Sequence, residues 1–150
     1  MAQKNEELMY DHFKDLFIKI MMKHGKKSTA ESIFEEALRE LRTQLINEEE
    51  DLNPKEIFMD ILLKSGPIVI VKSKRRGRQS VQVPVVLNTE RKAAIASKWI
   101  IEGARSRNDK TMGLRLAKEI LALRQGQGKA NKNQTLMHKQ AFANRFNANL

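Results

Sequence analysis

The stretch 98-KWIIEGARSRNDKTMGLRLAKEI-120 contains two helix-like segments on either side of a polar turn. Apolar residues recur every three or four positions in both segments, as expected of helices that pack one face against a core. Many of the polar positions between and beside them carry Lys or Arg. The stretch predicts two packed helices whose connecting loop forms a folded surface for a polyanion.

Positive and negative charges are unevenly distributed along the chain. Residues 1–63 contain nine Lys and Arg against fourteen Asp and Glu, whereas residues 64–150 contain nineteen against four, so the net charge of +10 is concentrated in the C-terminal part. Clustered cations bind nucleic acid by releasing the counterions condensed on its phosphates. A membrane surface would call for a basic helix with an exposed bulky apolar face, and the Ala-rich basic helices here do not fit that description.

Several classes of function receive no support from the residues. The chain has no Cys, which excludes disulfides and thiolate sites. It has neither an 18-residue apolar run nor an N-terminal signal pattern, so we expect it to work in the compartment where it is made. His12, His24 and His138 lie far apart in the sequence, and neither an HExxH motif nor a phosphate-binding glycine loop occurs. We therefore expect neither an enzyme nor a bound cofactor or metal.

The N-terminal half predicts three helices. Apolar residues occur in pairs every four positions from Leu8 to Met21, with His12 among them, which predicts a helix that buries a narrow stripe. The sequence 28-STAE-31 has the spacing of a capping box at the start of a second helix. Asn53 followed by Pro54 is typical of the start of a third helix.

A change of pattern after Pro67 predicts a β-hairpin over about residues 68–87. Two β-branched runs, 68–71 and 81–86, flank the sequence 72-KSKRRGRQS-80. Two strands alone are marginal in water, so the hairpin should project from the helices as an arm. Five cations near its tip lead us to expect an arm that is ordered by RNA or by a neighbouring protein.

Three more helices follow the arm. Asn88 or Thr89 is a candidate cap for the fourth, and Asn108 or Asp109 for the fifth. The polar sequence from about 125 to 134 predicts a mobile linker, and a short final helix is expected over about 135–146. The predicted fold is mainly α: one domain over residues 1–150, with six helices and a projecting β-hairpin arm between helices 3 and 4.

Four blocks give the chain a resemblance to a known family. They are 24-HGKKSTAESI-33, 71-VKSKRRGRQSVQVPV-85, 98-KWIIEGARSRNDKTMGLRLAKEI-120 and the weaker 139-KQAFANRF-146. Their content and order resemble the bacterial-type family of the seventh protein of the small ribosomal subunit. The resemblance implies a structural protein of the subunit head that binds the 3′ major domain of the small-subunit rRNA and organises head assembly. It also implies a position near the exit-site tRNA and the mRNA path, beside neighbouring small-subunit proteins.

The resemblance also assigns residues by position. The rRNA-binding set is then Lys26, Lys27, Lys72, Lys74, Arg91, Lys92, Arg105, Arg107, Lys110, Arg115 and the apolar contact Met112. The arm and the C-terminal helix would face tRNA and mRNA through Arg75, Arg76, Arg78, Lys139 and Arg145.

The sequence departs from the family pattern at both ends. The N-terminus is short and nearly neutral where members commonly carry a basic extension, and the basic lead-in to the last helix is replaced by 129-KANKNQ-134. An acidic run, 48-EEED-51, is also unusual. These departures indicate a mitochondrial ribosome, with the bacterial cytoplasm as the alternative location.

Other interpretations of the same features stay open. A basic β-arm also occurs in DNA-architectural proteins, which often place an apolar or Pro wedge at the tip, and 72-KSKRRGR-78 has none. A helical RNA-modifying enzyme would need an acid–base or nucleophilic set that the sequence does not offer. Trp99 is expected to pack in the core rather than stack on a base.

Overall fold

A computed structural model describes residues 1–149. Within these residues the chain forms six α-helices, a two-stranded antiparallel hairpin and a short terminal 3-10 helix. The elements are α1 (Ala2–Met21), α2 (Lys27–Asn47), α3 (Pro54–Ser65), β1 (Val69–Arg76), β2 (Gln79–Val86), α4 (Thr89–Arg105), α5 (Met112–Arg124), α6 (Lys129–Ala143) and η1 (Arg145–Asn147). The predicted class, six helices with a hairpin between the third and the fourth, is confirmed.

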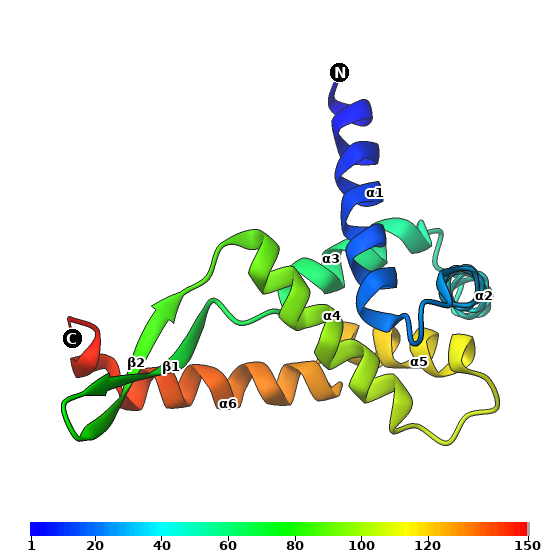
Figure 1. Cartoon of the computed structure of the whole chain (residues 1–150). Helices are drawn as coiled ribbons and strands as arrows, with labels where there is room; N and C mark the ends of the chain where they lie inside the picture. Colours follow the sequence, from blue (N-terminus) through cyan, green and yellow to red (C-terminus); the bar gives the residue numbers. More distant parts are fainter. Residues whose placement is uncertain (150) are drawn as a thin grey trace.

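The helices form a body from which two parts extend (Figure 1). The first half of α1 rises from one side of the body, and the hairpin leaves it in another direction. Helix α6 contacts both α4 and β1, so it runs from the body along the base of the arm. The chain therefore carries its hairpin on a long helix rather than on a sheet.

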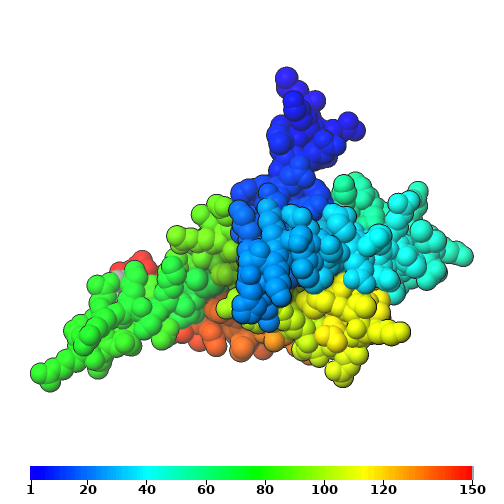
Figure 2. All heavy atoms as spheres, turned by 45° about the vertical axis from the view of Figure 1, so that its right-hand side comes forward, coloured from blue at the N-terminus to red at the C-terminus, as the bar shows by residue number. Residues whose placement is uncertain are grey.

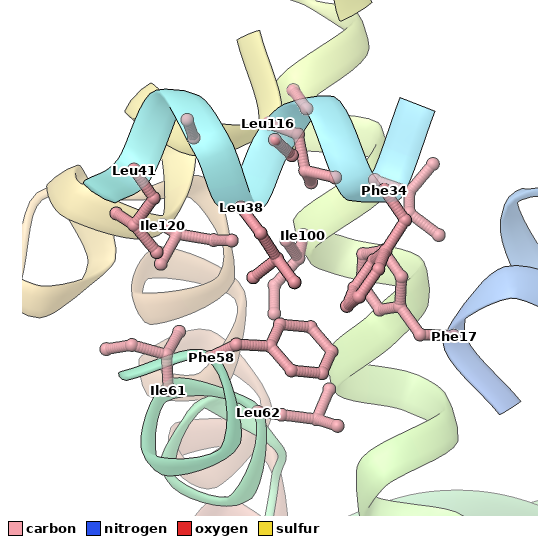
Figure 3. Close-up of a cluster of buried hydrophobic side chains, with 14 of the residues drawn as sticks. Phe17, Phe34, Leu38, Leu41, Phe58, Ile61, Leu62, Ile100, Leu116 and Ile120 are labelled. Atoms are coloured by element: carbon pink, nitrogen blue, oxygen red, sulfur yellow. The ribbon is translucent and has the colours of Figure 1, made fainter. Parts of the chain in front are cut away.

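The core is built around three phenylalanines from the first three helices. Phe17 of α1, Phe34 of α2 and Phe58 of α3 are almost fully buried, and their ring centroids lie 5.0 to 5.8 Å apart. The rings meet edge to face or tilted, which is the favoured arrangement for aromatic pairs. Figure 3 shows Ile100 of α4 and Leu116 and Ile120 of α5 in the same cluster. This cluster joins the two helices of the basic stretch to the acidic N-terminal half.

Tyr10 marks the edge of the core on α1. Its ring meets Phe58 edge to face at 6.4 Å, and its hydroxyl is buried without a hydrogen-bond partner among the described residues. Burial, together with the negative charges of Glu35 and Asp11, raises the pKa of Tyr10 to about 12. The phenol therefore stays neutral well beyond physiological pH.

The predicted apolar stripe of α1 is wrong for its first turns. Leu8 and Met9 are 60% and 46% exposed, and His12 is also exposed, with Nε2 3.6 Å from Glu90 Oε1. From Phe13 onward the stripe faces the core: Phe13, Phe17 and Met21 are buried, and Leu16 and Ile20 are half-buried against it. The periodicity predicts a continuous buried face, but the start of the helix extends beyond the body, and residues 1–149 leave its first turns largely exposed.

Helix starts agree with the sequence in part. Asn53 and Asn88 accept hydrogen bonds from Lys55 N and Arg91 N, which confirms these two caps. The predicted capping box is wrong, because α2 already begins at Lys27 without a side-chain cap. Helix α5 is capped by Thr111 rather than by Asn108 or Asp109.

The bounds predicted for the C-terminal segment also differ from the structure. Helix α6 covers Lys129–Ala143 rather than 135–146, so the connection to α5 is reduced to residues 125–128 in place of the predicted linker 125–134. The polar composition of residues 129–134 favoured a linker, but Ala130 is fully buried and the Lys129 amide donates to the Glu119 carboxylate. Tertiary contacts thus override local composition here.

We predict that Phe58→Ala lowers the free energy of unfolding by about 3–5 kcal/mol, because it removes a buried ring that touches three other aromatic rings. The same truncation at Phe142, which is 66% exposed, should cost less than about 1 kcal/mol. Denaturant unfolding of both variants checks this. Equal losses would show that the aromatic cluster is not the centre of the core.

Candidate nucleic-acid interface

Four helix ends meet around an open hollow of about 210 Å³. It lies where α1 ends, α2 begins, α4 ends and α5 begins, and its floor includes Met21, Ala30 and Ile33. Of the residues predicted for rRNA, the structure brings Lys26, Arg105 and Met112 together here. Lys23 also lines the hollow and was missed by the sequence prediction, although it lies just before the first matching block.

Arg105 has a structural partner as well as an exposed position. One of its guanidinium nitrogens, Nη2, donates to the carbonyl oxygen of Met21 at 3.2 Å. Met21 is the last residue of α1, where carbonyl groups lack partners within the helix and carry partial negative charge. Arg105 therefore joins the end of α4 to the end of α1 and places part of its charge at the hollow.

The loop between α4 and α5 is held by its own side chains. Arg115 Nε donates to the carbonyl oxygen of Asp109 at 2.6 Å, and Lys118 Nζ donates to the Asp109 carboxylate at 2.6 Å. Thr111 caps α5 and donates its hydroxyl to Glu36 of α2 at 3.0 Å. Lys110 lies within this fixed loop, exposed, and has no side-chain partner among residues 1–149.

Arg107 is tied to the interior of the molecule. Its Nε donates to Glu119 Oε2 at 2.8 Å, and the Glu119 side chain is only 4% exposed. The Arg107 side chain is 31% exposed, so part of the guanidinium reaches the surface. This predicted rRNA residue is held in place by an ion pair that the sequence did not reveal.

The remaining helix cations lie elsewhere. Arg91 and Lys92 are at the first turn of α4, and this helix of 17 residues is about 25 Å long, so they are not brought to the hollow at its other end. Arg91 is exposed, whereas Lys92 is half-buried against Gly66, beside the base of the arm. Lys27 begins α2 and lies 4.0 Å from Glu31.

The arm extends away from the body (Figure 2). Strands β1 and β2 pair in register from Val69 with Val86 to Arg76 with Gln79, and Gly77 turns the chain with a φ of 62°. The cations on the outer half are all exposed: Lys72, Lys74, Arg75, Arg76 and Arg78. The structure therefore places the two rRNA-assigned lysines beside the three arginines assigned to tRNA and mRNA.

Helix α6 and the segment after it hold the base of the arm. The amide of Ile68 donates to His138 Nε2 at 3.0 Å, and Gln134 Nε2 donates to the carbonyl oxygens of Lys64 and Gly66 at 3.0 Å each. Asn147 Nδ2 donates to the Gln82 carbonyl oxygen at 3.0 Å. Only the outer part of the hairpin is free of the helices.

The C-terminal residues assigned to tRNA and mRNA lie on exposed surface. Lys139 is exposed on α6, and the Arg145 guanidinium lies 4.1 Å from the ring centroid of Phe142 and 4.5 Å from that of Phe146. Both rings are largely exposed, and no apolar periodicity in the sequence singled them out. Trp99, by contrast, packs against the core as predicted.

Other kinds of site are not found in the part of the chain that the structure describes. Residues 1–149 contain no group of three or more His, Asp or Glu side chains placed to hold a metal ion. No helix in the same range is long and apolar enough to cross a bilayer.

Comparison with known proteins agrees with the basic surface. The family model described as "Ribosomal protein S7p/S5e" matches residues 3–145. Small ribosomal subunit protein uS7 of Wigglesworthia glossinidia brevipalpis is 43% identical over 129 residues, which cover 86% of this chain and 80% of the relative. The protein of the same name from Methylobacterium radiotolerans is 38% identical over 148 residues, which cover 96% of this chain and 92% of the relative.

Both relatives are bacterial, as is the uS7 protein of Acholeplasma laidlawii, which is 41% identical over 85% of this chain and 79% of its own length. The mitochondrial location suggested by the departures at the two ends therefore receives no support, and departure from a pattern is a weak guide to source because surface positions drift in any lineage. Taken with the helical body, the basic hollow and the hairpin arm, the match over nearly the whole sequence shows that the chain belongs to the ribosomal protein S7p/S5e family.

Proposed function

We propose that this protein is a structural constituent of the small ribosomal subunit that binds the 3′ major domain of its rRNA and helps to organise the subunit head. Support comes from the family and from relatives that carry the name of a small-subunit protein. On this proposal the arm and the C-terminal helix lie near the exit-site tRNA and the mRNA path, and neighbouring small-subunit proteins cover other faces. The location would be ribosomes of the bacterial cytoplasm.

The observation that carries the proposal is a group of unpaired cations at one end of the body. Lys23 and Lys26 line the hollow, and Lys110 precedes Met112 of the same hollow by two residues. None of the three lysines has a side-chain partner among the described residues. Each of these unpaired lysines can displace a counterion from a phosphate without first breaking an internal ion pair.

The mechanism is neutralisation of several phosphates at fixed positions. Arg105, Arg107 and Arg115 each donate to a carbonyl or carboxylate oxygen. They thereby hold the helix ends and the α4–α5 loop in place while part of their charge faces outward. Met112 offers an apolar contact beside the lysines. Side chains cannot read base edges in the deep groove of A-form RNA, so specificity comes from the shape of the rRNA junction. The chemistry is that of binding and not of catalysis.

A DNA-architectural role is the second candidate. Proteins that bend DNA with a β-arm insert an apolar wedge into a base step. Residues 72–80 of the arm are all exposed and contain no bulky apolar side chain. The arm is therefore better suited to lie along phosphates than to unstack bases.

We predict that Lys23→Ala, Lys26→Ala and Lys110→Ala combined lower the salt slope of rRNA binding by about 0.7 to 0.9 for each phosphate that the variant no longer neutralises. Because these side chains hold no internal partner, the helical fold should be retained. The measurement is a titration of labelled 3′ major domain RNA at several salt concentrations.

A matched control removes three cations from another surface: Lys4→Ala, Arg39→Ala and Arg42→Ala, all exposed on α1 and α2. This triple variant loses the same charge, so long-range electrostatics alone would weaken binding equally in both. We expect an unchanged slope in the control. Equal slopes in the two triple variants would remove the hollow from the interface.

A second prediction concerns the arm. The sequence led us to expect that the whole arm is ordered only by a partner, but α6 already holds its base. Amides of residues 69–71 and 83–86 should therefore exchange slowly in the free protein, whereas those of residues 73–80 should exchange fast and become protected only with RNA. Amide hydrogen exchange with and without the rRNA domain tests this. Strong protection of the tip in the free protein would show that no ordering is coupled to binding.

A further inference from the structure

Glu119 is a buried carboxylate with two different partners. It lies on α5 and is 3% exposed. Oε2 accepts from Arg107 Nε at 2.8 Å, and Oε1 accepts from the backbone amide of Lys129 at 3.0 Å. Each oxygen is thus committed to a separate segment of the chain, one to the α4–α5 loop and the other to the start of α6.

The bond to Lys129 supplies a helix cap from outside the helix. Lys129 is the first residue of α6, and Gly128 at the N-cap position has no side chain that could accept from the first amides. A negative group near a helix N-terminus is favoured both by the free amides and by the helix dipole. The Glu119 carboxylate therefore caps α6 from the neighbouring helix.

Two glycines leave room for this carboxylate. A Cβ at Gly103 of α4 would clash with Glu119 Oε1, and one at Gly128 would clash with Leu123 and lie 3.1 Å from the same oxygen. Both glycines are buried. The backbones of α4 and of the α5–α6 connection thus approach the carboxylate closely enough to exclude water and to fix its position.

The basic surface has two parts, the hollow and the arm, and Glu119 joins a segment beside the first to a segment that holds the second. Arg107 is in the loop beside the hollow, and α6 holds the base of the arm through Gln134 and His138. Capping therefore fixes where α6 begins, and α6 in turn fixes the base of the arm.

We propose that Glu119 is a positioning residue of the RNA interface: its buried carboxylate orients the Arg107 guanidinium toward phosphate and aligns α6 with the loop. This inference rests on the proposed function. Arg107 bonds to Glu119 through Nε and its side chain is 31% exposed, so its two terminal nitrogens can serve a phosphate. A guanidinium fixed in this way can meet a phosphate with two parallel hydrogen bonds and needs no ordering on binding.

The direction in which RNA affinity changes when Glu119 is neutralised distinguishes a positioning role from a purely electrostatic one. Glu119 is a negative charge close to a surface that binds a polyanion, so removing that charge should strengthen RNA binding if charge alone matters. A positioning role predicts weaker RNA binding instead. Glu119→Gln keeps the shape, but its NH2 group must face either the Arg107 N–H or the Lys129 N–H, so one of the two hydrogen bonds is lost.

The test compares wild type, Glu119→Gln, Arg107→Ala and the double variant for binding to 3′ major domain RNA at fixed salt. We expect Glu119→Gln to bind roughly tenfold more weakly, as for the loss of one charge-assisted hydrogen bond. In the Arg107→Ala background the same change should cost clearly less than in wild type, because the part of its effect that runs through Arg107 is already lost and only the contribution of the α6 cap remains. A purely structural role would instead give additive losses.

Glu102→Gln is the matched control. Glu102 is a carboxylate one residue before Gly103, is 39% exposed, and lies 3.9 Å from Lys129 Nζ. Its neutralisation removes the same charge from the same region without touching Arg107. Binding should be unchanged or stronger in this control.

Arg107→Lys keeps the inference testable if Glu119→Gln does not fold. Lysine retains the charge but cannot hold Glu119 and a phosphate in the geometry of a planar guanidinium. We expect Arg107→Lys to lose nearly as much affinity as Arg107→Ala. Wild-type affinity in Arg107→Lys, or equal or tighter binding in a folded Glu119→Gln protein, would overturn the positioning role. A wild-type protein without preference for the rRNA domain would instead overturn the proposed function itself.

Discussion

The buried Glu119 carboxylate, on which our account of the basic surface depends, joins the α4–α5 loop to the start of α6. Removing a charge from water costs several kcal/mol unless it is paired and hydrogen-bonded. Arg107 and the first amide of α6 supply that compensation, and Gly103 and Gly128 allow the approach. These partners come from segments that are separate in the sequence. The carboxylate is satisfied only when all of them are in place, so it couples the loop beside the hollow to the helix that carries the arm.

The distribution of acidic residues explains how the basic part of the chain remains both folded and cationic. The four carboxylates after residue 63 each lie within 4.0 Å of a basic side chain: Glu90 near His12, Glu102 near Lys129, Asp109 near Lys118 and Glu119 near Arg107. They brace helices and loops and leave a large excess of positive charge outside. In the N-terminal part, Phe17, Phe34 and Phe58 provide the hydrophobic anchor. Ile100, Leu116 and Ile120 of the basic part pack into the same core.

Local patterns were sufficient for much of the fold. The hairpin, its position between the third and fourth helices and the caps at Asn53 and Asn88 follow from β-branched runs and polar residues at helix starts. The errors have a common physical cause, which is tertiary contact. Leu8 and Met9 are exposed because the first turns of α1 extend beyond the body formed by the described residues, and α6 begins early because the Glu119 carboxylate caps it. At the candidate site, residue type was enough to find the cations. Only the structure shows that Arg105 and Arg107 have side-chain hydrogen-bond partners, whereas Lys110 has none among the described residues. No pattern in the sequence pairs positions 107 and 119.

The central claim is that this frame presents unpaired cations to one RNA shape rather than to polyanions in general. It is tested most directly by titrating the purified protein, over a series of salt concentrations, with the 3′ major domain of small-subunit rRNA, a scrambled RNA of equal length and duplex DNA. The account predicts a preference for the rRNA domain that survives near-physiological salt, because shape complementarity persists when counterion release weakens. Equal and steeply salt-dependent binding to all three would contradict it.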